Sequence, residues 1–390
     1  MRVLLITPGT RGDVAPAAGL GARLRAAGHE VAIAANPPYR NVVEASGCTW
    51  RELPGDLAPL LAGEGSGSSF RQLTAYMDLA AEGALTAAAE GVDAILVNAV
   101  APFGHDIADR LGVPSAGAFL QPMHPSAAYP PMLLGLPRSL GPRGNRLAGL
   151  ALAAAPAPHD KARRRIGRSR RKPHVFHGFS EVVVPRPHDW PARLSITGYW
   201  WPAMPAGWQP PADLLEFLDA GPPPVFLGFG SNGATDQALI IEAARLAGVR
   251  AVVQSARPSG SGTRTRIEVG EVPHEWLFPR MAAVVHHGGA GTTAAGLRAG
   301  VPTVAVPRYT DQPFWARRVH ALGAGPAPVP HRLLANPPRG GTSPAETLAA
   351  AIRAAVTEPR YRQNARAMAR RLSTEDGAAP IVNWLEQPRA

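Results

Sequence analysis

Apolar and polar residues follow one another along the chain in blocks that predict buried strands joined by amphipathic helices. In the first half, short apolar runs at residues 3–7, 30–34 and 94–98 are typical of strands in a parallel sheet. Helical spacing is predicted over residues 17–27, 73–90 and 103–111. This alternation predicts a parallel sheet that is covered by helices on both faces.

A second series of the same kind begins near residue 224. Residues 224–231 are predicted to be a strand that runs into a glycine turn, further strands are predicted at residues 251–253, 282–286 and 303–306, and helices at residues 345–371 and 379–386. Tryptophan and proline crowd residues 199–224, which is typical of an interdomain linker, here interrupted by a short helix near residues 212–218. We therefore expect an N-terminal domain (1–200), a linker (201–222), a C-terminal domain (223–371) and a final helical segment that packs back on the N-terminal domain (372–390).

The length of 390 residues fits two domains. No apolar run reaches membrane-spanning length, and the first apolar run is too short for a signal peptide. The single cysteine, Cys48, fits a reducing compartment and is expected to be a small buried residue. We expect a cytoplasmic protein without stable membrane insertion, and the sequence leaves its oligomeric state open.

The net charge of +11 owes much to a basic tract at residues 161–172. Such a tract fits either a solvated face or a site for an acidic partner, and its role stays open. No zinc-finger, RNP or basic-zipper pattern accompanies it, so we expect no nucleic-acid partner.

The most informative stretch is a strand that ends in paired histidines and runs through glycines into a helix. His287 precedes Gly288, Gly289, Gly291 and Thr292. Backbone N–H groups at such a helix start, aided by the helix dipole, bind phosphate, and glycine allows close approach. The stretch predicts a diphosphate site, although a core histidine bonded to the backbone is the alternative for His287.

Two further strand ends carry polar residues. Ser231 follows the strand at residues 224–228, where its hydroxyl fits either a phosphate contact or a helix cap. Asp311 and Gln312 follow another strand, where an acid beside an amide can hold sugar hydroxyls or start a helix.

The N-terminal turn at residues 7–16 also follows a strand, so it is expected at the ligand-binding edge of the sheet. The three-glycine dinucleotide fingerprint is absent, and no nicotinamide cofactor is expected. Asp13 in this turn fits either an N-cap aspartate or a general base.

Metal sites are not expected. No paired-carboxylate D-x-D triplet occurs, and His286 and His287 should point to opposite faces of a strand. His174 and His177 have no nearby cysteine or acidic partner in the sequence. We therefore predict no metal and no bound cofactor.

Three segments together resemble the nucleotide-sugar-dependent glycosyltransferases of the GT-B architecture, family 1, in the branch of vancomycin-type antibiotic and sterol glycosyltransferases. They are MRVLLITPGTRGDVAPAAGLGARLRAAGHEV, PVFLGFGS and GEVPHEWLFPRMAAVVHHGGAGTTAAGLRAGVPTVAVPRYTDQPFWARRVHALGAG. The resemblance implies an α/β protein with two Rossmann-like parallel-sheet domains that face a central cleft.

The resemblance also implies roles for individual residues. Asp13 matches the general base of this branch. The donor diphosphate is matched by Ser231, His287, Gly288, Gly289, Gly291 and Thr292, the donor sugar by Asp311 and Gln312, and the nucleobase by Val272, Pro273 and His274. The stacking tryptophan of plant relatives aligns with Glu271, so uridine and thymidine both stay open.

An aromatic and methionine-rich group in the first half suggests an apolar acceptor pocket, although several members would serve equally as core. Its members are Phe103, Phe119, Met123, His124, Tyr129 and Met132. His29 and His124 are considered as partners that could raise the basicity of Asp13.

The sequence thus predicts an inverting, metal-independent glycosyltransferase. It would move a sugar from a UDP- or dTDP-sugar to a hydroxyl of a small apolar acceptor, such as a bacterial antibiotic-type aglycone. The alternatives are a sterol or lipid glucosyltransferase, a nucleotide-sugar epimerase and a non-catalytic nucleotide-sugar-binding activator.

Overall fold

The structure is a computed structural model that describes residues 1–57, 70–136, 138–202, 204–205, 207–229, 237–258, 262–308, 310–335 and 342–387. The chain divides into two compact units. The first unit comprises residues 1–131, 139–206 and 375–390, and the second comprises residues 132–138 and 207–374. Each unit is built on its own parallel sheet.

The sheet of the first unit has seven strands within the described residues, and all neighbours pair in parallel. In the order of pairing they are β3 (Thr49–Glu52), β2 (Glu30–Ala35), β1 (Arg2–Ile6), β4 (Ala94–Val97), β5 (Ser115–Phe119), β6 (Val175–His177) and β7 (Leu194–Ile196). Ile6 at the end of β1 lies between Ala34 and Val97. The carboxyl ends of these three strands therefore meet at one edge.

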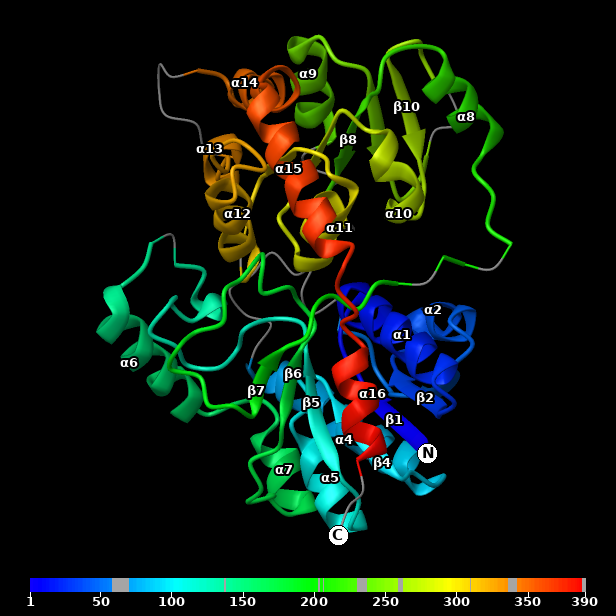
Figure 1. Cartoon of the computed structure of the whole chain (residues 1–390), viewed down its shortest axis with the longest axis vertical. Coiled ribbons are helices and arrows are strands. Elements are labelled where there is room, and N and C mark those ends of the chain that lie inside the picture. The colour runs from blue at the N-terminus through cyan, green and yellow to red at the C-terminus, as the bar shows by residue number, and fades with distance from the viewer. Residues whose placement is uncertain are drawn as a thin grey trace. The chain divides into compact units, whose positions relative to one another are not determined.

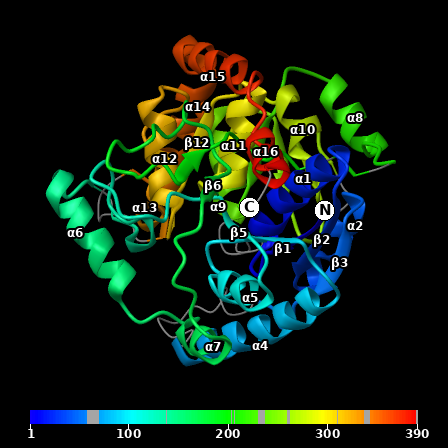
Figure 2. The ribbon, with the colours of Figure 1, turned by 60° about the horizontal axis from the view of Figure 1, so that its bottom comes forward.

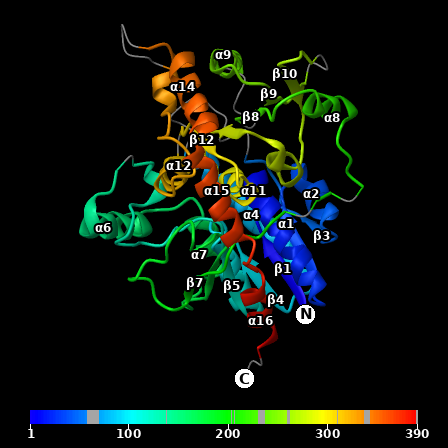
Figure 3. The ribbon, with the colours of Figure 1, turned by 45° about the horizontal axis from the view of Figure 1, so that its top comes forward.

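Helices cover both faces of this sheet because alternate side chains of β1 point to opposite sides. Val3 and Leu5 pack against α1 (Arg11–Ala26), α2 (Arg40–Ala45) and α16 (Ala379–Glu386) (Figures 1 and 3). Leu4 and Ile6 face α4 (Phe70–Ala89), α5 (Phe103–Leu111) and α7 (Asp160–Ile166). The unit also contains α6 (Gly141–Ala154) and the 3-10 turn η1 (Pro37–Tyr39). Cys48 is buried in the α1 face, as the sequence predicts.

Helix α1 begins at Arg11, well before the predicted start at residue 17. Thr10 is the N-cap, and Asp13 closes a capping box by accepting the Thr10 N–H at 2.9 Å. Pro16 lies inside the helix and removes one hydrogen bond to the carbonyl of Gly12, a residue that is exposed and can be solvated. Asp13 is therefore the third helical residue and not the N-cap.

Most of the basic tract is exposed, as the solvated-face interpretation predicts, and several of its side chains pair with carboxylates of the first unit. Arg163 makes a bidentate pair with Asp106, at 2.7 Å from Nε and 2.9 Å from Nη2. Asp106 has no exposed side-chain surface and also accepts the N–H of Ser169. The other pairs are Lys161–Asp78, Arg165–Glu82, Arg168–Asp160 and Arg171–Asp109. Most of these ion pairs join α7 and the loop after it to α4 and α5 (Figure 2).

The sheet of the second unit has five parallel strands among the described residues. In the order of pairing they are β10 (Arg266–Val269), β9 (Ala251–Gln254), β8 (Val225–Gly228), β11 (Ala283–His286) and β12 (Thr303–Ala305). One face packs on α9 (Gln237–Ala247), α13 (His331–Ala335) and α14 (Pro344–Thr357). The other face packs on α8 (Ala212–Asp219), α10 (His274–Leu277), the 3-10 turn η4 (Phe278–Arg280) and α11 (Ala290–Ala299). Helices α12 (Gln312–Ala321) and α15 (Pro359–Leu372) pack on α11, and η2 (Met132–Leu134) belongs to this unit.

Two predicted segments differ from the structure here. Leu214 and Phe217 of α8 are buried in the core of the second unit, so this part of the expected linker is integral to that unit. The helix predicted at residues 345–371 is two helices, because Pro359 cannot continue α14 and instead opens α15. Among the described residues, none of the helices combines the length and apolar character needed to cross a bilayer.

The buried Arg163–Asp106 pair gives a stability prediction. Arg163→Met should lower the free energy of unfolding by about 3 kcal/mol, because it leaves the Asp106 carboxylate buried without its cation. Urea denaturation measures this change.

The matched control is Arg165→Met, which removes an exposed partner of Glu82 and should cost less than about 1 kcal/mol. Equal effects of the two substitutions would show that burial does not make the Arg163 pair special.

Candidate functional site

Each sheet has one point where the strand order reverses. In the first unit β1 lies between β2 and β4, and in the second β8 lies between β9 and β11. Ligands of open parallel sheets bind at the carboxyl ends of the strands at this switch point. Asp13 follows β1 in the first unit, and His287 follows β11 in the second. The two predicted centres therefore lie at the two switch points.

The turn after β1 is built around the Asp13 carboxylate. Oδ2 accepts the backbone N–H and the hydroxyl of Thr10, at 2.9 and 3.1 Å. Gly9 has φ +142°, and a Cβ there would overlap the carboxylate. The capping box thus fixes Asp13 in the first turn of α1.

Asn36, which the sequence analysis did not single out, fixes this turn by a hydrogen bond to its backbone. It is completely buried at the end of β2. Its Oδ1 accepts Gly9 N–H at 3.1 Å and Tyr76 O–H at 2.8 Å, and its Nδ2 donates to the carbonyls of Leu53 and Gly55. All four hydrogen-bonding positions are filled, and burial raises the pKa of Tyr76. Its position directly after an apolar strand is the feature of the sequence that could have identified Asn36 as a site residue.

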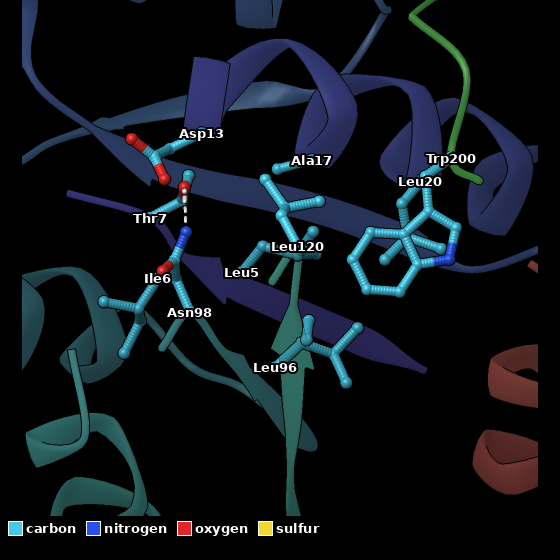
Figure 4. A pocket seen from close by; sticks show the side chains of 11 residues that line it. Leu5, Ile6, Thr7, Asp13, Ala17, Leu20, Leu96, Asn98, Leu120 and Trp200 are labelled. Carbon is cyan, nitrogen blue, oxygen red and sulfur yellow. Dashed lines mark hydrogen bonds between the residues drawn. The ribbon is translucent and has the colours of Figure 1, made fainter. Parts of the chain in front are cut away.

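A small hollow lies beside Asp13, with room for about one water molecule. Thr7 and Asn98 stand next to Asp13 at one end, where Asn98 Nδ2 donates to Thr7 Oγ1 at 3.3 Å (Figure 4). The indole of Trp200 closes the other end (Figure 4). The rest of the lining is apolar: Leu5, Ile6, Ala17, Leu20, Leu96, Ala118 and Leu120. The polar end has room for a hydroxyl, and the apolar lining belongs to the core of the first unit.

Three of the predicted acceptor residues form one aromatic group with His177 and Trp190. Phe119 stacks on His124 at 5.5 Å, and Tyr129 meets Trp190 edge-on at 6.4 Å. His177 and Trp190 stack at 4.6 Å. Burial lowers the pKa of His124 to about 4 and that of His177 to about 3, so both rings are neutral near pH 7. The group is therefore an uncharged aromatic surface.

The other proposed acceptor residues lie elsewhere. Phe103 is completely buried in the core under α4 and α5, so it is a packing residue. Met123 is half-buried, and Met132 belongs to the second unit. His29 lies at the amino end of β2, near the N-terminus and Glu386, so it cannot assist Asp13. His124 is committed to the aromatic group.

The predicted diphosphate turn joins β11 to α11. Gly289 is the N-cap and offers no side chain to cap the first backbone N–H groups of the helix. Gly288 has φ +85°, and a Cβ on Gly289 would lie 2.6 Å from His287 Nε2. Only glycine allows the His287 ring to lie over this turn, so ring and backbone donors share one surface.

His287 itself is half-buried and has a Nδ1 atom without a partner among the described residues. Burial lowers its pKa to about 4, and the charge of Arg308 adds to this effect. The ring is therefore neutral near pH 7 and has hydrogen-bonding capacity that the fold leaves unused. Because Nδ1 is buried, a contact with a ligand would fall to the Nε2 edge of the ring, and the diphosphate role of His287 stays a prediction.

Asp311 and Gln312 lie at the start of α12, beside the diphosphate turn. A Cβ on Gly288 would lie 3.1 Å from the Gln312 carbonyl oxygen. Gln312 Oε1 accepts the N–H of Arg308 at 2.9 Å, and Asp311 Oδ2 accepts the indole N–H of Trp315 at 2.9 Å. Burial raises the pKa of Asp311, while hydrogen bonds from Trp315 and Thr310 oppose the shift.

Thr310 adjoins this pair with φ +53°, a conformation that threonine rarely adopts. Strain of this kind clusters at ligand sites. Asp311 is the N-cap by position, but its side chain does not cap the helix. Asp311 therefore starts the helix by position, and the sugar-holding role of Asp311 and Gln312 stays a prediction.

The predicted nucleobase residues lie between β10 and α10. Val272 has its side chain in the core, so any contact with a base falls to its backbone. Pro273 is the N-cap of α10. The His274 ring stacks on Phe278 at 4.2 Å and meets Phe226 edge-on at 5.7 Å.

Ser231 lies outside the described residues, so its predicted role stays a prediction. In the described part of the chain, no group of three or more His, Cys, Asp or Glu side chains could hold a metal ion.

Comparison with known proteins identifies the family. Residues 249–387 match the model of the erythromycin biosynthesis protein CIII-like C-terminal domain, and residues 3–117 match that of the glycosyltransferase family 28 N-terminal domain. The chain is 35% identical to O-mycaminosyltylonolide 6-deoxyallosyltransferase of Streptomyces fradiae, over 99% of this chain and 98% of that protein. The chain belongs to the antibiotic-type glycosyltransferases.

This glycosyltransferase is also 32% identical to sterol 3-beta-glucosyltransferase UGT80A2 of Arabidopsis thaliana, over 85% of its own length and 58% of that protein. The crystal structure of the Streptomyces sp. SF2575 glycosyltransferase SsfS6, complexed with thymidine diphosphate, matches with a TM-score of 0.70 and 23% identity and covers 100% of both chains. The predicted GT-B glycosyltransferase family and α/β fold are thereby confirmed.

The diphosphate turn gives a prediction that separates stability from binding. Gly291 is exposed, and a Cβ on it would meet no protein atom within 4 Å. Gly291→Ala should therefore raise the free energy of unfolding by about 0.5–1 kcal/mol, since alanine is the better helix residue.

The same methyl group would occupy the space above the backbone donors of α11, so the affinity for UDP or dTDP should fall at least about ten-fold. Urea denaturation and titration calorimetry measure the two effects. Unchanged nucleotide affinity would show that no diphosphate uses that space.

The aromatic group of the first unit gives a pH prediction. His177 is completely buried, and its folded-state pKa of about 3 lies below the ordinary value near 6.5. Below about pH 6.5 the unfolded chain therefore binds a proton at this residue that the folded chain does not bind. The free energy of unfolding consequently decreases as the pH is lowered. Between pH 7 and pH 5 this residue should remove about 2 kcal/mol.

In His177→Phe, the decrease in unfolding free energy between pH 7 and pH 5 should be smaller by about 2 kcal/mol. Urea denaturation at each pH measures this difference. The matched control is His188→Phe, which removes an exposed imidazole from the same unit. An unchanged pH dependence in His177→Phe would contradict the assignment.

Proposed function

We propose that this glycosyltransferase is inverting and metal-independent, and that it moves a sugar from a UDP- or dTDP-sugar to a hydroxyl of a small apolar acceptor of the antibiotic type. One observation carries the proposal. At the switch point of the second sheet, an uncapped helix start lies beside the Nε2 edge of the His287 ring. Such an arrangement suits a doubly charged diphosphate.

The donor side needs no metal ion in this scheme. The first backbone N–H groups of α11 and the helix dipole would stabilise the negative charge that develops on the diphosphate as it leaves. His287 would add a hydrogen bond as a neutral ring, with Ser231 as a further donor. Asp311 and Gln312 would hold the sugar hydroxyls.

The acceptor side relies on Asp13 as general base. Asp13 would take the proton of the acceptor hydroxyl, and the oxygen would attack the anomeric carbon on the face opposite the diphosphate. The new carbon–oxygen bond forms as the bond to the diphosphate breaks, and the leaving diphosphate keeps the bonding electrons. A single displacement of this kind inverts the anomeric configuration.

The hollow beside Asp13 supports this assignment, because it joins a polar end to an apolar wall. The polar end of this hollow, beside Asp13, Thr7 and Asn98, would receive only the hydroxyl of the acceptor. The neutral aromatic group around Phe119 and His124 offers further apolar contact. A small apolar alcohol fits this chemistry better than a sugar or a peptide.

The named relatives support the same proposal. One is named for transfer of 6-deoxyallose to O-mycaminosyltylonolide, and the SsfS6 structure holds thymidine diphosphate. These names favour a dTDP-sugar over a UDP-sugar as the donor. They also favour an antibiotic-type acceptor.

The proposal predicts a large and selective effect of Asp13→Asn. The amide oxygen can still accept the Thr10 N–H, so the capping box survives, but the base is lost. Turnover with the best acceptor from an aglycone panel should fall about 10²–10⁴-fold. Calorimetry should give an unchanged affinity for the nucleoside diphosphate.

The matched control is Thr10→Ala, which weakens the same cap by about 1 kcal/mol and removes the hydroxyl that donates to Asp13, but keeps the carboxylate itself. Full turnover by Asp13→Asn would reduce Asp13 to a capping residue. A loss of turnover in Thr10→Ala as large as that in Asp13→Asn would lead to the same conclusion.

A further inference from the structure

His286 is completely buried at the end of β11 and is not one of the residues assigned to the donor site above. Its Nδ1 accepts the backbone N–H of Gly288 at 3.0 Å. An imidazole nitrogen that accepts must be unprotonated, so the proton of the neutral ring is on Nε2. Nε2 has no partner in the part of the chain that the structure describes.

Because Nε2–H has no partner among the described residues, the benefit of an imidazole at this position must come from Nδ1. A buried N–H without a partner destabilises a fold. An apolar ring of similar size would fill the same space without that cost. What the imidazole adds is the acceptor at Nδ1, and this acceptor engages one atom of the diphosphate turn.

Gly288 is the residue at which that turn changes direction. Its φ is +85°, and it lies against the backbone of Gln312. The carbonyl of His286 is held by Val306 N–H at 2.9 Å, so both ends of the His286–Gly288 segment are fixed. The orientation of the Gly288 peptide in turn sets the direction of the N–H groups of Gly289 and Ala290.

We infer that His286 is a positioning residue for the nucleoside diphosphate, which it never touches: by holding Gly288 N–H, it pre-forms the backbone turn that receives the phosphates. The inference rests on the proposed function of that turn. Pre-forming a binding loop raises affinity because the loop does not have to be ordered when the ligand arrives. It also removes the Gly288 N–H as a competing donor and leaves the helix-start N–H groups facing the ligand.

Two amide variants separate this role from simple packing. In His286→Asn the side-chain oxygen can take the place of Nδ1, whereas in His286→Gln the amide reaches to the place of Nε2. Glutamine is nearer to histidine in volume, so a packing role predicts that Gln is the better replacement. A positioning role predicts the opposite order. His286→Phe keeps the ring shape and removes both nitrogens.

Titration calorimetry with dTDP and with UDP is the direct experiment, with thermal unfolding of each ligand-free variant beside it. We expect His286→Asn to bind within about three-fold of the unaltered protein, and His286→Gln and His286→Phe to bind about ten-fold more weakly. Equal affinities for the Asn and Gln variants, or tighter binding by Gln, would overturn the role of His286. If the unaltered protein binds neither nucleotide, the donor site itself is wrong and the proposed function fails with it.

A second measurement needs no variant and so does not depend on how the substitutions fold. A hydrogen bond from an amide nitrogen to an imidazole nitrogen gives a scalar coupling between the two ¹⁵N nuclei. We expect this coupling between Gly288 N and His286 Nδ1 in the ligand-free protein. A resolved Gly288 signal without the coupling would overturn the inference.

Discussion

The shared direction of the strands decides where every candidate functional residue of this glycosyltransferase lies. All strands of a parallel sheet end at the same edge, and the helix that follows each strand begins there with its N–H groups unpaired. At the two switch points, neighbouring helices leave toward opposite faces and open a space between them. Asp13 and His287 are the polar residues that follow β1 and β11 into those spaces.

The two strand-to-helix turns differ in how they satisfy the unpaired N–H groups at the start of the following helix. In the first unit the start of α1 is closed by its own carboxylate, since Asp13 accepts the Thr10 N–H. The dipole of α1 favours negative charge at this position. In the second unit the start of α11 has glycine as its N-cap and no acidic residue in its first turn. One turn therefore carries a carboxylate at its helix start, and the other leaves its first backbone N–H groups uncapped.

Much of the fold could be predicted from local pattern. The strands with long apolar runs, such as β1 and β11, and the helix α5 with its Gly112 cap are strong local signals. The strands β6 and β7 have three residues each, too few for an alternation to stand out. The early start of α1 was missed because Pro16 suggests a break, while the capping box that overrides it is a subtler signal.

The candidate site could be predicted only in part. Residues that would contact a ligand stand in glycine-rich turns, which the sequence displays directly. Asn36 and His286 act through other residues. The role of Asn36 depends on contacts with residues distant in the sequence, such as Tyr76, and that of His286 depends on a single buried hydrogen bond. The basic tract shows the same limit, because its carboxylate partners Asp78 and Asp106 lie far away in the sequence.

The central claim is that the second unit binds a nucleoside diphosphate without a metal ion. The most direct test is a thermal-unfolding series of the full chain with dTDP, UDP, GDP and NAD, each in the presence of EDTA. At about 100 times its dissociation constant, a bound nucleotide should stabilise the fold by about 2.7 kcal/mol. The account predicts a higher melting temperature with dTDP or UDP and no change with NAD. A series in which neither dTDP nor UDP raises the melting temperature, or in which they do so only after magnesium is added, would contradict it.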